Sequence, residues 1–157
     1  MKYYRNTATV LVILAVVALE FNTTIPCLAQ SKPPYASDKP LTEPMMFGEG
    51  VISTTEDELN ACFTPDGKTI YFSLNAPVNR LGVIVFSRFE NGEWRTPQVA
   101  PFSGQYSDYD PFISPDGNKL FFISNRPVDN NPKKDYDVWV VEKTNGGWSA
   151  PKNLGAP

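Results

Sequence analysis

The feature that most constrains the fold is an internal repeat in the second half of the chain. Residues 63–72 (FTPDGKTIYF) match residues 113–122 (ISPDGNKLFF) at an offset of 50. The match continues at the same offset, because residues 75–78 (NAPV) correspond to residues 125–128 (NRPV). Self-similarity at a fixed period predicts one supersecondary unit that is built more than once.

The end of each copy matches at a slightly longer offset. Residues 91–97 (NGEWRTP) correspond to residues 145–151 (NGGWSAP) at an offset of 54. The second copy therefore carries four extra residues, which we place within residues 130–134 (NNPKK).

Each copy divides into four short strands. Pro65-Asp66-Gly67-Lys68 predicts a tight turn, because proline presets φ, aspartate accepts from the backbone and glycine adopts the left-handed conformation. Asn91-Gly92 is a strong hairpin signal, and Pro97 suits an outer edge strand. No segment after residue 44 has a convincing helical period. The predicted strands are residues 60–64, 69–74, 83–89 and 93–99 in the first copy and 109–114, 119–124, 137–142 and 148–154 in the second.

Four antiparallel strands that recur at about fifty residues are typical of a β-propeller blade. A sandwich or a closed barrel does not predict the same four-strand unit twice. We therefore expect an all-β, partial β-propeller with two four-stranded antiparallel blades, at about residues 47–104 and 105–157. Residues 50–54 (GVIST) have the composition of one extra strand.

The repeat also resembles a known family. Residues 64–73 (TPDGKTIYFS) and 114–122 (SPDGNKLFF) resemble the SPDG element of the WD40-like propeller repeat (PD40) of TolB-type propellers. Residues 137–140 (DVWV) look like its third strand, and residues 148–155 (WSAPKNLG) look like its blade ending. The first copy lacks the aspartate of the third strand, since residues 82–85 read GVIV. The resemblance implies the propeller fold but little about function, because propellers host many activities.

The N-terminal segment has the pattern of a secretory signal peptide. Lys2 and Arg5 precede an apolar run at residues 10–19, and Ala29 supplies a small residue at the predicted cleavage site. The run is shorter than the roughly 20 residues that span a bilayer, so an uncleaved anchor is the weaker alternative. We predict a signal peptide at residues 1–29, a Pro-rich linker at residues 30–46, and a periplasmic or secreted location.

Composition excludes several kinds of chemistry. The chain contains no histidine, which rules out Ser-His-Asp triads, Cys-His pairs and histidine-ligated metals. A formal net charge of −3 argues against a nucleic-acid partner, which needs a clustered basic surface. Cys62 remains as a single thiol after cleavage, so we expect no internal disulfide and a buried, unreactive sulfur.

The remaining candidates for chemistry have structural explanations. The Pro-Asp-Gly turns differ from a sialidase-type Asp-box, because their glycine comes one place too early. The pairs Asp108/Asp110 and Asp135/Asp137 could hold Ca²⁺ or act as acid and base, but Asp110 and Asp137 occupy repeat positions where a structural role is expected.

Three further features have competing interpretations. Trp94 and Trp148 share a repeat position and so favour blade packing over sugar stacking, the role also considered for Trp139. Residues 56–58 (EDE) are most simply a solvated loop. Arg126 corresponds to Ala76 and could face the central channel, so it departs from the repeat in a chemically interesting way.

The sequence therefore predicts an exported, non-enzymatic β-propeller module that binds a protein, a peptide or an envelope glycan through its loops. We predict no catalytic, cofactor-binding or metal-binding residues and no cofactor. Closed propellers have about four to eight blades, so we expect a fragment of a longer propeller, with self-association into a ring as the alternative. The alternative function is the N-terminal propeller part of an exported hydrolase, a peptidase or glycan-active enzyme whose catalytic residues lie elsewhere.

Overall fold

The structure is a computed structural model that describes residues 40–76, 81–128 and 135–155. These residues form two antiparallel sheets and no helix, which confirms the all-β prediction for this part of the chain. The predicted signal peptide (residues 1–29), most of the predicted linker and the insertion at residues 130–134 lie outside the described residues. Residues 40–46, the described part of the predicted linker, form no strand and are exposed.

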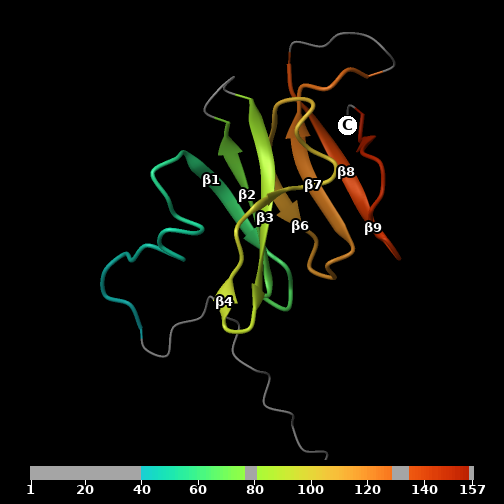
Figure 1. Cartoon of the computed structure of the whole chain (residues 1–157). Helices are drawn as coiled ribbons and strands as arrows, with labels where there is room; N and C mark the ends of the chain where they lie inside the picture. Colours follow the sequence, from blue (N-terminus) through green and yellow to red (C-terminus); the bar gives the residue numbers. More distant parts are fainter. Residues whose placement is uncertain (1–39, 77–80, 129–134, 156–157) are drawn as a thin grey trace, which may run out of the picture. The chain divides into compact units, whose positions relative to one another are not determined.

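The first sheet contains the strands of the first repeat copy in meander order (Figure 1). The order is β1-β2-β3-β4. Strand β5 also pairs with β3. The strands are β1 (Glu58–Phe63), β2 (Thr69–Asn75), β3 (Gly82–Glu90), β4 (Glu93–Trp94) and β5 (Gln98–Val99). The predicted fourth strand is thus divided in two, with Pro97, which has no N–H to donate, between the parts.

The second sheet repeats this arrangement. Its path is β6-β7-β8-β10, and β9 also pairs with β8. The strands are β6 (Asp108–Ile113), β7 (Lys119–Ser124), β8 (Asp137–Thr144), β9 (Gly147–Trp148) and β10 (Lys152–Asn153). Each copy therefore builds its own sheet, as the offset in the sequence predicted.

The Pro-Asp-Gly turns have the expected geometry in both copies. In the first, the Thr64 hydroxyl donates to Asp66 (2.6 Å) and the Lys68 N–H donates to the same carboxylate (3.0 Å). Gly67 adopts a φ of 68°, the left-handed conformation that favours glycine. The same bonds recur in the second copy, where Asp116 is the acceptor.

The first strand of each sheet, β1 or β6, carries a bulge, and the repeat alone did not predict these matching bulges. Asn60 in β1 and Asp110 in β6 both have positive φ, at 47° and 56°, and the pairing register shifts at both places. Asparagine and aspartate tolerate this conformation better than other non-glycine residues. The Asn60 side-chain amide donates to the Asp110 carboxylate, so the bulges link β1 to β6.

The two sheets pack face to face around a shared core. Because side chains alternate along a strand, Tyr71 and Ile84 lie on one face of the first sheet, while Ile70 and Phe72 lie on the other. The first pair meets Leu120 and other side chains of the second sheet. The shared core consists of Tyr71, Ile84 and Ala100 from the first copy and Ile113, Leu120, Phe122, Trp139 and Val141 from the second.

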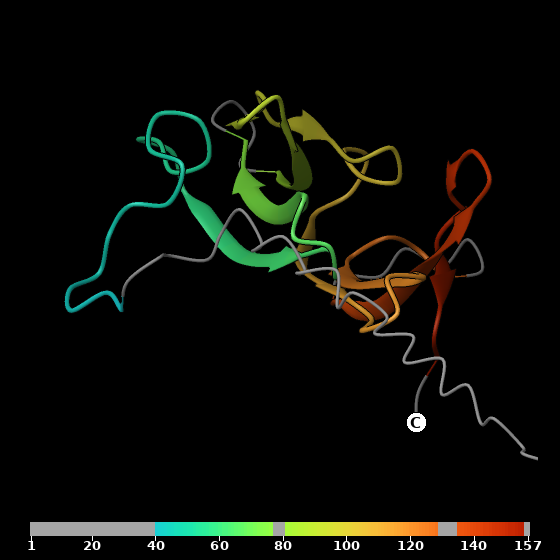
Figure 2. The same cartoon turned by 90° about the horizontal axis from the view of Figure 1, so that it is seen from below.

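The opposite face of the first sheet is covered by residues 47–53, which we call the strap. Phe47, Val51 and Ile52 pack on Ile70, Phe72 and neighbouring apolar side chains. The prediction of an extra strand at residues 50–54 is wrong. These residues form turns around Gly48 and Gly50, closed by an isolated bridge between Glu49 and Ser53. Figure 2 shows the strap, in teal, on the side of the first sheet away from the second.

Candidate functional site

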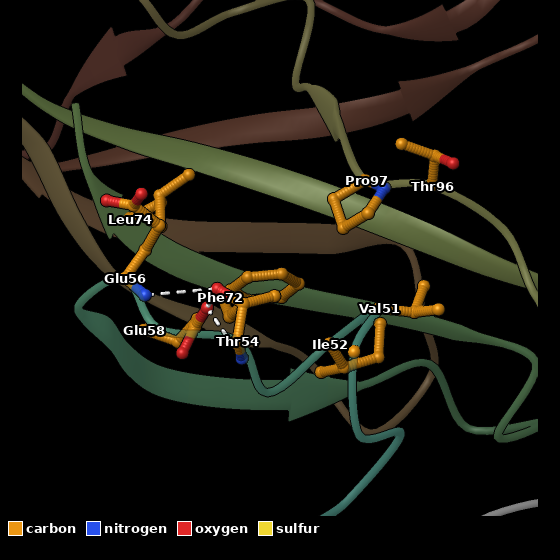
Figure 3. Close-up of a pocket in the computed structure, with 10 residues that line it drawn as sticks. Val51, Ile52, Thr54, Glu56, Glu58, Phe72, Leu74, Thr96 and Pro97 are labelled. Atoms are coloured by element: carbon orange, nitrogen blue, oxygen red, sulfur yellow. Dashed lines mark hydrogen bonds between the residues drawn. The ribbon is translucent and has the colours of Figure 1, made fainter. Parts of the chain in front are cut away.

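A hollow of about 320 Å³ lies between the strap and the first sheet. Its floor is apolar. Ile52 of the strap, Phe72 and Leu74 of β2, and Pro97 between β4 and β5 converge there (Figure 3). Thr54, Glu56 and Glu58 stand at its rim. The strap therefore leaves part of the face that it covers unfilled.

Hydrogen bonds between Thr54, which follows the strap, and Glu58 of β1 stabilise the rim. The backbone N–H of Thr54 donates to the Glu58 carboxylate (3.1 Å), and the Thr54 hydroxyl donates to the same oxygen. The N–H of Glu56 donates to the Thr54 hydroxyl oxygen at 3.1 Å (Figure 3). Of the predicted solvated loop at residues 56–58, Glu56 and Asp57 are exposed, but Glu58 is half-buried and begins β1.

A second candidate surface is the side of the second sheet that faces away from the first. Phe112, Val138 and Leu154 are exposed there, and Phe121 and Ile123 are half-buried beside them. Phe112 pairs with Phe121 across β6 and β7, and their ring centroids are 6.3 Å apart. Ile123 pairs with Val138 across β7 and β8. We call these five residues the open face.

The counterparts of the open face in the first sheet are buried, except Cys62, the counterpart of Phe112, which is half-buried. Val138 is 47 % exposed and Leu154 is 49 % exposed, whereas the residues 54 positions earlier, Ile84 and Ala100, are 0 % and 1 % exposed. Phe121 corresponds, at the offset of 50, to Tyr71, which lies in the shared core. The open face thus keeps the apolar character of a face that packs on another sheet, and its residues Phe112, Val138 and Leu154 are exposed.

A buried ion pair joins the start of the second sheet to the end of β7. Arg126 Nη2 lies 2.7 Å from Asp108 Oδ1, and both side chains are almost fully buried, at 8 % and 0 % exposed by residue. Ser103 donates to the other Asp108 oxygen at 2.7 Å. Arg126 also donates to the Ser124 hydroxyl (2.9 Å) and to the Phe102 carbonyl (3.1 Å). Both Asp108 oxygens and the Nε and Nη2 of Arg126 are therefore hydrogen-bonded, which offsets part of the cost of burying the two charges.

The burial of Arg126 corrects one sequence interpretation. Arg126 was expected as a side chain that could face a channel, but it lies over the rings of Phe122 (4.9 Å) and Trp139 (5.2 Å) instead. The sequence held a signal for this pair. Glu58 and Ala76 of the first copy are replaced together by Asp108 and Arg126 at the same offset of 50.

Two of the other paired acids, Asp110 and Asp137, bond to side chains of neighbouring strands. The N–H of Asp110 donates to Ser73 (3.0 Å), and its carboxylate accepts from Asn60. The Asp137 carboxylate accepts from the Asn153 amide (3.3 Å), which links β8 to β10, whereas Asp135 is exposed. Within residues 40–76, 81–128 and 135–155, no three or more acids or cysteines gather in a metal-binding arrangement.

The tryptophans pack within the sheets. Trp94 contacts Phe47 (5.6 Å) and Phe89 (5.3 Å), and Trp148 lies perpendicular to Phe102 (6.4 Å). The Trp148 indole N–H donates to the Tyr71 hydroxyl (3.0 Å), across the interface between the sheets. The Trp139 indole N–H is buried and has no hydrogen-bond partner.

Cys62 is a half-buried free thiol next to the second sheet. Burial raises the pKa of this thiol to about 11, although a backbone hydrogen bond at Ile113 acts in the opposite direction. The thiol is therefore protonated at neutral pH, which agrees with the unreactive cysteine that the sequence predicts.

Comparison with protein-family models, with curated proteins and with solved structures finds no match. The part of the chain that the structure describes also has no helix that is long and apolar enough to cross a membrane. Inference about function therefore depends on the two surfaces and the residues described above.

Proposed function

We propose that the chain is an exported, non-enzymatic binding module made of two propeller-type blades, and that it binds a protein through the open face. The observation that carries this proposal is the exposure of Val138 and Leu154 at positions whose counterparts, Ile84 and Ala100, are buried by a neighbouring sheet. Contiguous exposed apolar side chains mark interaction surfaces more often than isolated ones do.

Three features support the propeller interpretation. Each repeat copy forms one meander, the inner strands β1 and β6 are linked through Asn60 and Asp110, and the sheets stack face to face. These are properties of adjacent blades. The PD40 resemblance and the export signal remain part of the same proposal, which places the module in the periplasm or outside the cell.

The packing within the chain defines the chemistry of the partner. The second sheet docks on the first through Leu120, Phe122 and Val141, which fill the spaces around Tyr71 and Ile84. The open face carries Phe121 and Val138 at the matching positions, so it fits a further sheet that presents aliphatic and aromatic side chains. Of a protein, a peptide and a glycan, a protein with such a sheet suits this surface best.

A defined partner tests the proposal. We would append a second copy of residues 102–155 after Gly155, so that the added sheet presents its own Leu120-type face to the open face. We expect the Tm to rise by about 5 °C or more, because each sheet-to-sheet interface adds stability. Val138→Lys in the receiving sheet should abolish the gain.

Val99 provides the matched control, because it is exposed to a similar extent but lies on β5 of the first sheet. Val99→Lys should leave the gain unchanged. An appended sheet that adds no stability would contradict docking at the open face. Hydrolysis of peptides or glycans by the purified chain would contradict the non-enzymatic part of the proposal.

A further inference from the structure

A separate hollow of about 350 Å³ lies between the two sheets, beyond one end of the shared core. Its aromatic lining comes from Tyr71, Phe86 and Trp148, and Arg88 and Lys143 also line it. The volume lies in the range of small-molecule sites, about 300–1,000 Å³. This hollow is distinct from both the open face and the strap.

The two cations extend the rows of side chains that build the core. In β3, Arg88 follows Ile84 and Phe86 on the same face, since alternate residues share a face. In β8, Lys143 follows Val141 in the same way. Ile84 and Val141 meet in the shared core, so Arg88 and Lys143 continue the same two facing surfaces into the hollow.

No acid lines the hollow to balance these two charges. Glu90, the next acid along the Arg88 face of β3, pairs instead with Arg95 at 3.6 Å. Within the described residues neither Arg88 nor Lys143 forms an ion pair, and the Arg88 guanidinium lies 4.8 Å from the Phe86 ring centroid. Two cations in one concavity of a chain with a net charge of −3 raise the local affinity for anions.

The aromatic residues supply the remaining recognition elements. The Tyr71 hydroxyl accepts the Trp148 indole N–H (3.0 Å), which leaves its own proton to donate to a ligand. Burial raises the pKa of Tyr71, so this donor persists through the neutral range. Thr64, Thr69 and the backbone of Gly146 add polar groups to the lining. The lining is therefore amphipathic and suits a ring that carries hydroxyl groups as well as a charge.

We propose that the hollow between the sheets binds an acidic sugar, with its carboxylate at Arg88 and Lys143 and its ring against the aromatic residues. Arginine binds a carboxylate through two parallel N–H donors. The C–H face of a pyranose packs on aromatic rings, and its hydroxyl groups require the polar groups of the lining. This site goes beyond the proposed function, because it uses other residues and another class of ligand than the open face does.

Titration of glucuronic acid and of glucose into the full chain, followed by NMR, tests the site. We expect glucuronic acid to shift the Trp148 indole signal and to bind about ten-fold or more tightly than glucose. Arg88→Gln should weaken glucuronic acid binding about ten-fold or more, while the amide spectrum shows that the fold is retained. Lys152→Gln makes the same change of charge on β10, outside the hollow, and should have no effect.

The following results would overturn the proposal. Equal binding of glucose would show that the cations do not recognise the carboxylate. Binding of benzoate without glucuronic acid would show that the hollow selects an aromatic ring and not a sugar. Signal changes that avoid Trp148, unchanged binding in Arg88→Gln, or no binding of glucuronic acid would place no acidic sugar in this hollow.

Discussion

The two sheets are built from the same repeat, yet their outer faces differ in burial. In the first sheet, Ile70 and Phe72 are covered by the strap and Tyr71 and Ile84 are covered by the second sheet, so both faces are buried. In the second sheet the face that carries Leu120 is buried, whereas on the other face Val140 is buried but Val138 and Leu154 are exposed. The strand pattern therefore sets which residues share a face, but the neighbours of a sheet decide whether that face is buried.

The sheets also differ in how their first strands are fixed. Asp108 of the second sheet pairs with Arg126 in the interior, whereas its counterpart Glu58 accepts from Thr54 at the surface, and Ala76 replaces the arginine. The same substitution at two equivalent positions, one in each sheet, can therefore show how much of the stability at that position depends on the surrounding residues and not on the repeat.

The largest expected difference concerns the buried ion pair. Asp108→Ala should lower the free energy of unfolding by about 3–5 kcal/mol, because it leaves the Arg126 charge buried without its partner. Glu58→Ala should cost about 1 kcal/mol or less, since its hydrogen bonds lie at the surface. Urea denaturation of both variants, followed by circular dichroism, measures the two changes.

A double variant shows whether the cost arises from the unpaired charge. Asp108→Leu combined with Arg126→Met replaces the pair by apolar side chains and should recover much of the stability lost in Asp108→Ala. Equal effects of Asp108→Ala and Glu58→Ala would remove the proposed difference between the sheets.

A smaller difference is expected at the equivalent positions Ile84 and Val138. Ile84→Ala removes a side chain from the shared core and should cost about 2–5 kcal/mol. Val138→Ala should cost about 1 kcal/mol or less, because Val138 is exposed. Thermal unfolding of the two variants gives the comparison, and a large loss in Val138→Ala would mean that the open face is covered in solution.

The smallest effect concerns the acids of the two Pro-Asp-Gly turns. The Ser114 hydroxyl and the N–H and side-chain amide of Asn118 lower the pKa of Asp116 to about 2. The Thr64 hydroxyl and the N–H of Lys68 lower the pKa of Asp66, but Lys68 offers no amide side chain.

The sign of the pH effect follows from these shifts. Because the folded-state pKa lies below the unfolded-state value, the turns are fully stabilised above about pH 4, and this stabilisation is lost as the pH falls towards about 2. Carboxyl carbon NMR should give a midpoint near pH 2 for Asp116, and Asn118→Ala should raise it towards that of Asp66. An ordinary midpoint for Asp116 would contradict the hydrogen bonds.

The local structure could be predicted from the sequence because it depends on near neighbours. The turns at Asp66 and Asp116 and the strand periods follow from residues within a few positions of each other. The strap was not predicted, because Val51 and Ile52 have a strand-like composition, whereas local hydrogen bonds at Gly48 and Gly50 fold them into turns that pack on Phe72. The Asp108–Arg126 pair and the hollow between the sheets likewise depend on side chains that tertiary packing brings together.

The strap makes the two outer faces of the paired sheets different, because it covers the outer face of the first sheet while residues of the open face are exposed. Two copies of the chain cannot join head to tail without displacing Ile52 from the face of the first sheet, because that face is already occupied. Repetitive, self-complementary surfaces that do not close risk unlimited polymerisation. Under the proposed docking, a further sheet can add at the open face but not at the face that the strap covers, which limits the growth of fibres.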